Sequence, residues 1–62
     1  MANERVCLLV DLTRHHPDFR LGAVGTNVGR SPLSDRFFRM CLESGAILDV
    51  LWKSVEVLPQ GS

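Results

Sequence analysis

Two adjacent histidines, His15 and His16, are the first residues whose chemistry suggests a site, because Asp11 and Asp18 lie close by in the sequence. Imidazole and carboxylate groups are common ligands of transition metals. Side chains of adjacent residues on an extended chain point apart, so neighbouring histidines rarely hold one ion together. The chain has only 2 histidines in all. We therefore expect a solvated loop here and no metal site.

Two cysteines, Cys7 and Cys41, are the remaining candidates for reactive groups. A nucleophilic thiolate needs an exposed position and a partner histidine, whereas both cysteines lie in apolar runs typical of structural residues. The spacing of Gly22 and Gly25 lacks the lysine or helix that a phosphate-binding loop requires. We expect no catalytic residue, no cofactor and no disulfide, although an active site formed between subunits stays open as an alternative.

Arginine dominates the basic residues, since only Lys53 among the 7 basic residues is a lysine. Arginine suits planar hydrogen bonding and stacking, so an arginine-rich surface with interleaved aromatic rings indicates single-stranded nucleic acid. The formal net charge of zero argues against tight binding of duplex DNA. The alternative is a solubilising rim of exposed arginines. The candidate nucleic-acid surface comprises Arg14, Arg20, Arg30 and Arg36, with Arg39, His15, His16, Phe19 and Phe37 beside them.

Short apolar runs separated by glycine and proline predict strands and turns rather than helices. Gly22 and Gly45 fit tight turns in which a positive φ is expected. The predicted strands are Arg5–Val10, a segment carrying Val24, Thr26 and Val28 on one face, a third strand within 34–43, Ala46–Trp52 and Val55–Leu58, with a short 3-10 turn at Lys53 and Ser54.

The segment 34–43 is ambiguous. Ser34 is a suitable helix cap, and Phe37, Met40 and Cys41 have helical spacing. A strand fits as well, because Phe38, Met40 and Leu42 alternate with polar or smaller residues. We favour the strand, since a hairpin-type turn at Ser44 and Gly45 follows it.

Both faces of two predicted strands are apolar, which is more than a small barrel can enclose. Either the loops fold over the outer apolar face, or this face binds another protein. A domain of this size often needs extra stabilisation, and self-association is a common source of it. We expect a homo-oligomer, with a dimer favoured. The expected interface residues are Cys7, Leu9, Phe37, Ile47, Leu51 and Trp52.

The order of the predicted elements resembles that of SH3-like barrels found among small bacterial, phage and mobile-gene-cassette proteins. The resemblance rests on 4–6, 21–26, 44–52 and 55–57. It implies an all-β, five-stranded SH3-like barrel. Type II dihydrofolate reductase shares this fold, and its Gly-Ser-Val-Gln-Ile-Tyr-Pro run is similar in spacing to 45–51. Its pore residues do not carry over, because Leu48, Asp49 and Val50 stand where that family has Gln, Ile and Tyr.

The composition, with 45% apolar and 23% charged residues, is that of a globular protein. We expect one domain over 1–62, with a core at 4–58 and a tail at 59–62. No signal or membrane-spanning segment is expected, which with the unpaired cysteines points to the cytoplasm. The sequence favours a non-catalytic binding or assembly module that self-associates, and the alternative is a small single-stranded nucleic-acid-binding protein.

Overall fold

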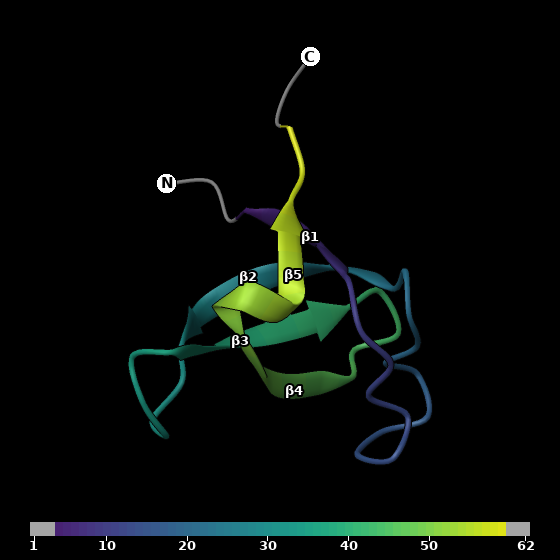
Figure 1. The fold of residues 1–62 in the computed structure, drawn as a ribbon, viewed down its shortest axis with the longest axis horizontal. Helices are drawn as coiled ribbons and strands as arrows, with labels where there is room; N and C mark the ends of the chain where they lie inside the picture. Colours follow the sequence, from purple (N-terminus) through teal and green to yellow (C-terminus); the bar gives the residue numbers. More distant parts are fainter. Residues whose placement is uncertain (1–3, 60–62) are drawn as a thin grey trace.

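The computed structural model describes residues 4–59, and almost all of their regular structure is β. Five strands form one antiparallel sheet in the order β4-β3-β2-β1-β5 (Figure 1). This confirms the all-β prediction, the five strands and the 3-10 turn before the last strand. Residues 60–62 of the predicted tail lie outside the described residues. The elements are β1 Arg5–Leu8, β2 Val24–Arg30, β3 Phe37–Leu42, β4 Ile47–Leu51, the 3-10 helix η1 Trp52–Ser54 and β5 Val55–Val57.

Three strands are shorter than predicted. β1 ends at Leu8 and not at Val10. The Leu9 N–H still donates to the Ser54 carbonyl oxygen at 2.8 Å, in register with the β1–β5 pairing, but Ser54 already belongs to η1 and the pairing goes no further. Val10 is accordingly exposed and does not join the core. β4 begins at Ile47 and stops at Leu51, since η1 takes over from there, and β5 ends one residue early at Val57.

The ambiguous segment is a strand. β3 pairs with β2 on one side and with β4 on the other, and Phe38, Met40 and Leu42 are buried while Arg39 is exposed. Ser34 caps no helix, because its hydroxyl oxygen accepts a hydrogen bond from the Arg36 N–H at 2.9 Å in the turn before β3. The hairpin turn after β3 has Gly45 at φ 92°, as the sequence predicted.

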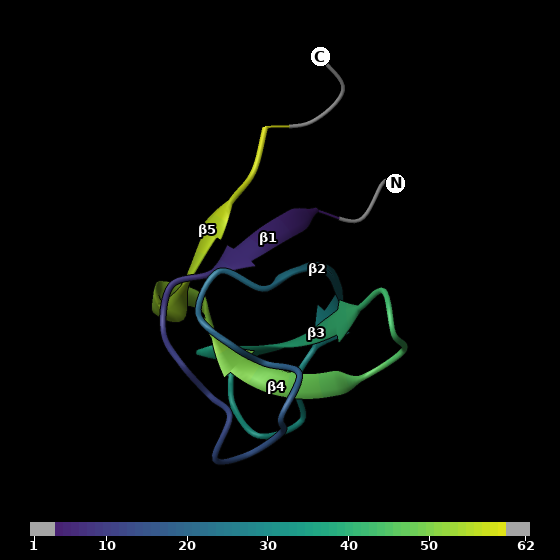
Figure 2. The same cartoon turned by 90° about the vertical axis from the view of Figure 1, so that its right-hand side faces the viewer.

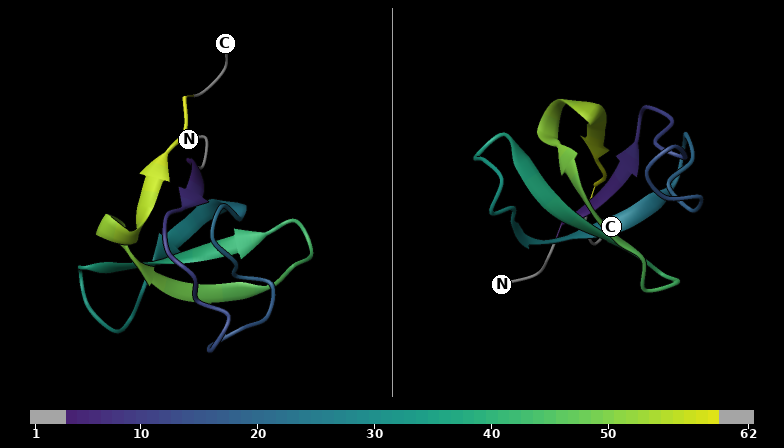
Figure 3. Two further views of the ribbon diagram at one scale, coloured as in Figure 1. Left: turned by 45° about the vertical axis from the view of Figure 1, so that its right-hand side comes forward. Right: turned by 90° about the horizontal axis from the view of Figure 1, so that it is seen from below.

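The sheet is strongly curled, and β1 and β5 lie across the direction of β3 and β4 (Figure 2). The concave side holds the core, which contains Val6, Leu8, Phe38, Met40 and Val50. The long loop between β1 and β2 runs over this side (Figure 3), and Leu12 and Phe19 from that loop pack into the core. A loop therefore closes the open side of the sheet.

The edge strands β4 and β5 are joined in sequence by η1, but no ladder of backbone hydrogen bonds joins them among residues 4–59. The sheet is therefore curled without being closed by hydrogen bonds. No helix within 4–59 has the length and apolar character needed to span a membrane.

Gly25 sits where three strands are closely packed, paired with Val6 of β1 and with Leu42 of β3. A Cβ atom at this position would lie 2.7 Å from the Cys41 carbonyl oxygen. Backbone atoms cannot move aside as a flexible side chain can, so only glycine fits. Two residues further, the register of β2 against β3 shifts at a bulge between Asn27 and Arg30, where the Gly29 N–H donates to Asn27 Oδ1 at 2.9 Å.

Gly25→Ala is expected to lower the free energy of unfolding by about 1–3 kcal/mol, because the added methyl group pushes β2 away from β3. At a permissive site the same change would stabilise the chain by about 0.4–1 kcal/mol. Urea denaturation measures the difference. Glu56→Ala, at an exposed position of the edge strand β5, is the control and should change stability by no more than about 0.5 kcal/mol. A stabilised Gly25→Ala variant would contradict the close approach.

Candidate functional site

The convex side of the sheet carries a continuous patch of small and apolar residues, which we call the outer face. Cross-strand pairing places its residues side by side. Cys7 of β1 lies opposite Val24 of β2. Cys41 of β3 lies opposite Thr26 of β2 on one side and Ile47 of β4 on the other. Side chains alternate between the two sides of a strand, so all of these point away from the core. Val24, Val28 and Ile47 are 37%, 43% and 54% exposed. The outer face comprises Arg5, Cys7, Val24, Thr26, Val28, Arg39, Cys41, Glu43, Ile47 and Asp49.

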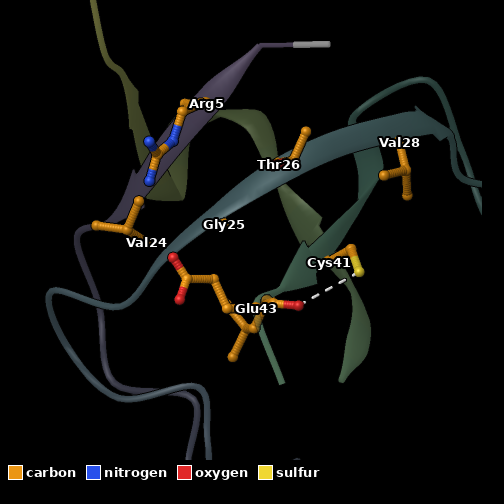
Figure 4. A pocket seen from close by; sticks show the side chains of 8 residues that line it. Arg5, Val24, Gly25, Thr26, Val28, Cys41 and Glu43 are labelled. Carbon is orange, nitrogen blue, oxygen red and sulfur yellow. Dashed lines mark hydrogen bonds between the residues drawn. The ribbon is translucent and has the colours of Figure 1, made fainter. Parts of the chain in front are cut away.

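A hollow of about 450 Å³ lies on this face over β1, β2 and the end of β3. Figure 4 shows Val24, Thr26, Val28 and Cys41 around it, with Arg5 and Glu43 on its flanks. The small side chains of Thr26 and Cys41 and the bare backbone of Gly25 leave the space unfilled. Apolar groups line the hollow, and one charge of each sign borders it, so it suits an apolar side chain from another molecule.

Charges on the outer face differ in whether they are paired. Arg39 Nε lies 3.5 Å from Asp49 Oδ1 on the neighbouring strand. Arg5 and Glu43 make no ion pair within residues 4–59. Both are exposed, so each is available to a charge of opposite sign on a partner.

The structure brings only some of the predicted interface residues together. Cys7 and Ile47 lie on the outer face. Phe37 and Leu51 are a half-buried cross-strand pair on the same side of β3 and β4 as Cys41 and Ile47, but at the other end of these strands, beside a groove of about 480 Å³ that Leu12 and Leu33 also line. Leu9 is exposed beyond the end of β1.

Trp52 lies apart from the outer face. Its ring packs against Phe38, with the ring centroids 4.4 Å apart and the planes at 33°. Phe38 is buried in the core. Trp52 therefore closes one end of the concave side, and 41% of it stays exposed.

The candidate nucleic-acid residues also separate into groups. Arg30 and Arg36 each border a depression against Trp52. Arg14 and Arg20 belong to the first loop and are exposed there. Phe19, which the sequence placed among the stacking residues, is 0% exposed and belongs to the core, so that expectation is wrong.

The His16 side chain stabilises the first loop. His16 Nδ1 accepts a hydrogen bond from the Asp18 N–H at 3.1 Å, and its ring meets Phe19 edge-to-face with centroids 5.5 Å apart. His15 is exposed. No group of three His, Cys, Asp or Glu side chains that could bind a metal ion occurs in the part of the chain that the structure describes.

Asp11 begins the turn that leads into this loop. Its Oδ1 atom accepts a hydrogen bond from the Thr13 N–H at 2.9 Å. This hydrogen bond favours the charged carboxylate and lowers the pKa of Asp11 below its usual value, with smaller contributions from the Thr13 hydroxyl and the Arg14 charge. Since the folded pKa is lowered, this contribution to stability is present at neutral pH and is lost as the pH falls through the folded pKa.

Val24 and Val28 were missed as interface candidates. The sequence correctly placed Val24, Thr26 and Val28 on one face, but alternation alone does not tell which face is buried. Gly25 gives the missing signal, because a glycine within a strand marks a close backbone approach. Its side of β2 is therefore the packed one, and the valines lie outside.

Comparison of the chain with protein-family models, with curated proteins and with solved structures found no match. The geometry of the outer face and of the Trp52 region is therefore the basis for assigning a function to this protein.

Phe19→Ala is expected to cost about 3–5 kcal/mol, because it empties a fully buried aromatic site. A domain of this size has roughly 3–5 kcal/mol of stability in total, so the variant should be largely unfolded at room temperature. Circular dichroism and thermal denaturation measure this. His15→Ala, in the same loop but exposed, should shift the melting temperature by no more than about 4 °C. A Phe19→Ala variant that melts like the parent would contradict the role of Phe19 in the core.

Proposed function

We propose that this protein is a non-catalytic assembly module that self-associates as a two-fold symmetric dimer through its outer face. The observation that carries the proposal is the exposure of Val24, Val28 and Ile47 on one side of a sheet whose other side is already filled. The first loop does not relieve this exposure, because Leu12 and Phe19 pack on the concave side. Association would bury the apolar residues that the fold leaves uncovered.

A second copy of the chain fits this face better than an unrelated partner does. A two-fold interface places each surface against its own copy, so it needs matching features within one face. The outer face holds both a protruding apolar residue, Ile47, and the hollow beside it. It also holds both unpaired charges, Arg5 and Glu43. In the dimer each Ile47 enters the hollow of the other copy, and each Arg5 meets the other copy's Glu43.

The size of the face supports a dimer. A stable interface buries at least about 1,000 Å² in total, or roughly 500 Å² per copy, which is roughly a ninth of the 4480 Å² surface of the chain. β1 to β4 together contain 22 residues, which at about 3.4 Å along a strand and about 4.8 Å between strands cover roughly 360 Å² of the sheet. Side chains that protrude from the sheet raise the accessible area above this value.

An SH3-like barrel is the architecture we propose for the module. Three features support it: the strand order β4-β3-β2-β1-β5, the central position of β2 and the 3-10 helix directly before β5. In this description η1 and the first loop take the place of a β4–β5 ladder. The thiols of Cys7 and Cys41 are free, which suits a reducing compartment such as the cytoplasm.

The dimer should have about twice the 6.9 kDa mass of the chain in light scattering at tens of micromolar. Ile47→Asp should shift the mass to that of a monomer while the β spectrum is kept. Losing two buried isoleucines costs the dimer at least about 3 kcal/mol, which weakens association more than roughly 100-fold.

Leu21→Asp is the matched control, because Leu21 is 67% exposed but lies in the first loop and not on the outer face. Its mass should equal that of the parent. Arg5→Glu should weaken the dimer, and combining it with Glu43→Arg should restore the dimer. A monomeric parent protein at these concentrations would refute the proposal.

A further inference from the structure

We infer that the surface around Trp52 binds single-stranded nucleic acid, with one base stacked on the indole and the adjoining phosphates held by Arg30, Arg36 and Lys53. The two depressions beside Trp52 share no lining residue with the hollow of the outer face, so this inference goes beyond the proposed function and does not depend on it.

The indole ring is held in a fixed position, and part of its surface is exposed to solvent. Trp52 begins η1, the coiled segment that joins β4 to β5 in Figure 1. The backbone N–H of Trp52 donates to the Arg36 carbonyl oxygen at 3.0 Å, and the indole ring packs on buried Phe38. The remaining 41% of the residue is exposed. A ring that is already ordered loses little conformational entropy when a base stacks on it.

Depressions flank Trp52 on two sides. One, of about 230 Å³, is lined by Arg36, Leu51, Trp52 and Lys53. The other, of about 340 Å³, is lined by Arg30, Asp35, Phe37 and Trp52. Each depression therefore combines the same aromatic ring with at least one cationic side chain.

Positive charge collects at this site although the chain as a whole is neutral. Arg30, Arg36 and Lys53 are all exposed, and Asp35 is the one acidic residue that lines either depression. None of the three cations makes an ion pair within residues 4–59. They are free to bind anions without first breaking an internal contact.

An exposed aromatic ring between cationic groups is the combination by which proteins bind single-stranded nucleic acid. The base stacks on the ring whatever its sequence, and the backbone phosphates lie against the cations. Duplex DNA fits less well, because its bases are already stacked within the helix. An acidic peptide would satisfy the cations but would leave the indole without a planar partner.

Fluorescence anisotropy of a labelled eight-residue oligothymidylate tests the inference with the intact chain. We expect binding no tighter than micromolar, since a single stacking ring and three cations make few contacts. The slope of log K against log salt should be about −1.4 to −2.1, which corresponds to two or three neutralised phosphates on a single strand. Quenching of Trp52, the only tryptophan in the chain, should follow the same binding curve.

Two competitors separate stacking from charge. An abasic oligomer with the same phosphates and a glutamate octapeptide should each bind at least tenfold more weakly than the oligothymidylate. Equal binding of the abasic oligomer would overturn the stacking role of Trp52. Equal binding of the peptide would identify the site as one for acidic protein segments and overturn the inference.

Variants locate the site. Lys53→Glu and Arg36→Glu change exposed side chains, so the fold should persist, and each should weaken binding about tenfold or more. Arg14→Glu is the matched control, because it makes the same charge change in the first loop and should leave binding within about twofold. Trp52→Ala removes a stacking contact and should reduce affinity by about tenfold, while Trp52→Phe should keep most of it. If Arg14→Glu weakens binding as much as Lys53→Glu, the inference is wrong.

The test is independent of dimerisation. Ile47→Asp should keep the nucleic-acid affinity of the parent while it abolishes the dimer, and Lys53→Glu should show the reverse. If either variant loses both dimerisation and nucleic-acid binding, the two surfaces are not separate.

Discussion

The packing of the Phe19 ring into the concave side of the sheet is the contact on which the rest of this structure depends. Five short strands cannot bury enough apolar surface by themselves in a chain of this size. The first loop supplies what the strands lack, since Leu12 and Phe19 join Val6, Leu8 and Met40 in one cluster. Backbone hydrogen bonds from Leu12 to Phe19 and from Phe19 to His16 hold the loop in the required shape.

Filling the concave side with a loop has a direct effect on the convex side. The first loop packs on the concave side, so it cannot also cover Val24, Val28 and Ile47 on the convex side. The close approach at Gly25 acts in the same direction, because it makes one side of β2 the packed side and turns the valines outward. Exposure of an apolar surface is thus the consequence of how a small core is completed, and it is the basis of the proposed self-association.

Much of the fold could be predicted from local patterns. Alternation in 37–42 and the glycine turns gave the strands and their order along the chain, because these signals depend on neighbouring residues. The ends of β1 and β4 could not be predicted, since both depend on η1, which follows β4 directly and occupies the positions where the pairing of β5 with β1 would continue. Phe19 was assigned to the surface because a polar loop surrounds it, and only the tertiary structure shows that this loop turns inward. For the candidate sites, the arginines and Ile47 could be found by type and pattern, whereas the proximity of Lys53 and Arg36 to one indole depends on how η1 meets the turn before β3.

The pairing of β5 with β1 has a consequence for how the chain folds. β1 lies between β2 and β5, and buried Val55 contributes to the core from β5. β1 and β5 are far apart in the sequence, and contacts between such distant segments form slowly. Until β5 pairs with it, β1 is an edge strand, and an exposed edge can pair with other chains. Docking of β5 therefore removes an edge at which a partly folded chain can aggregate.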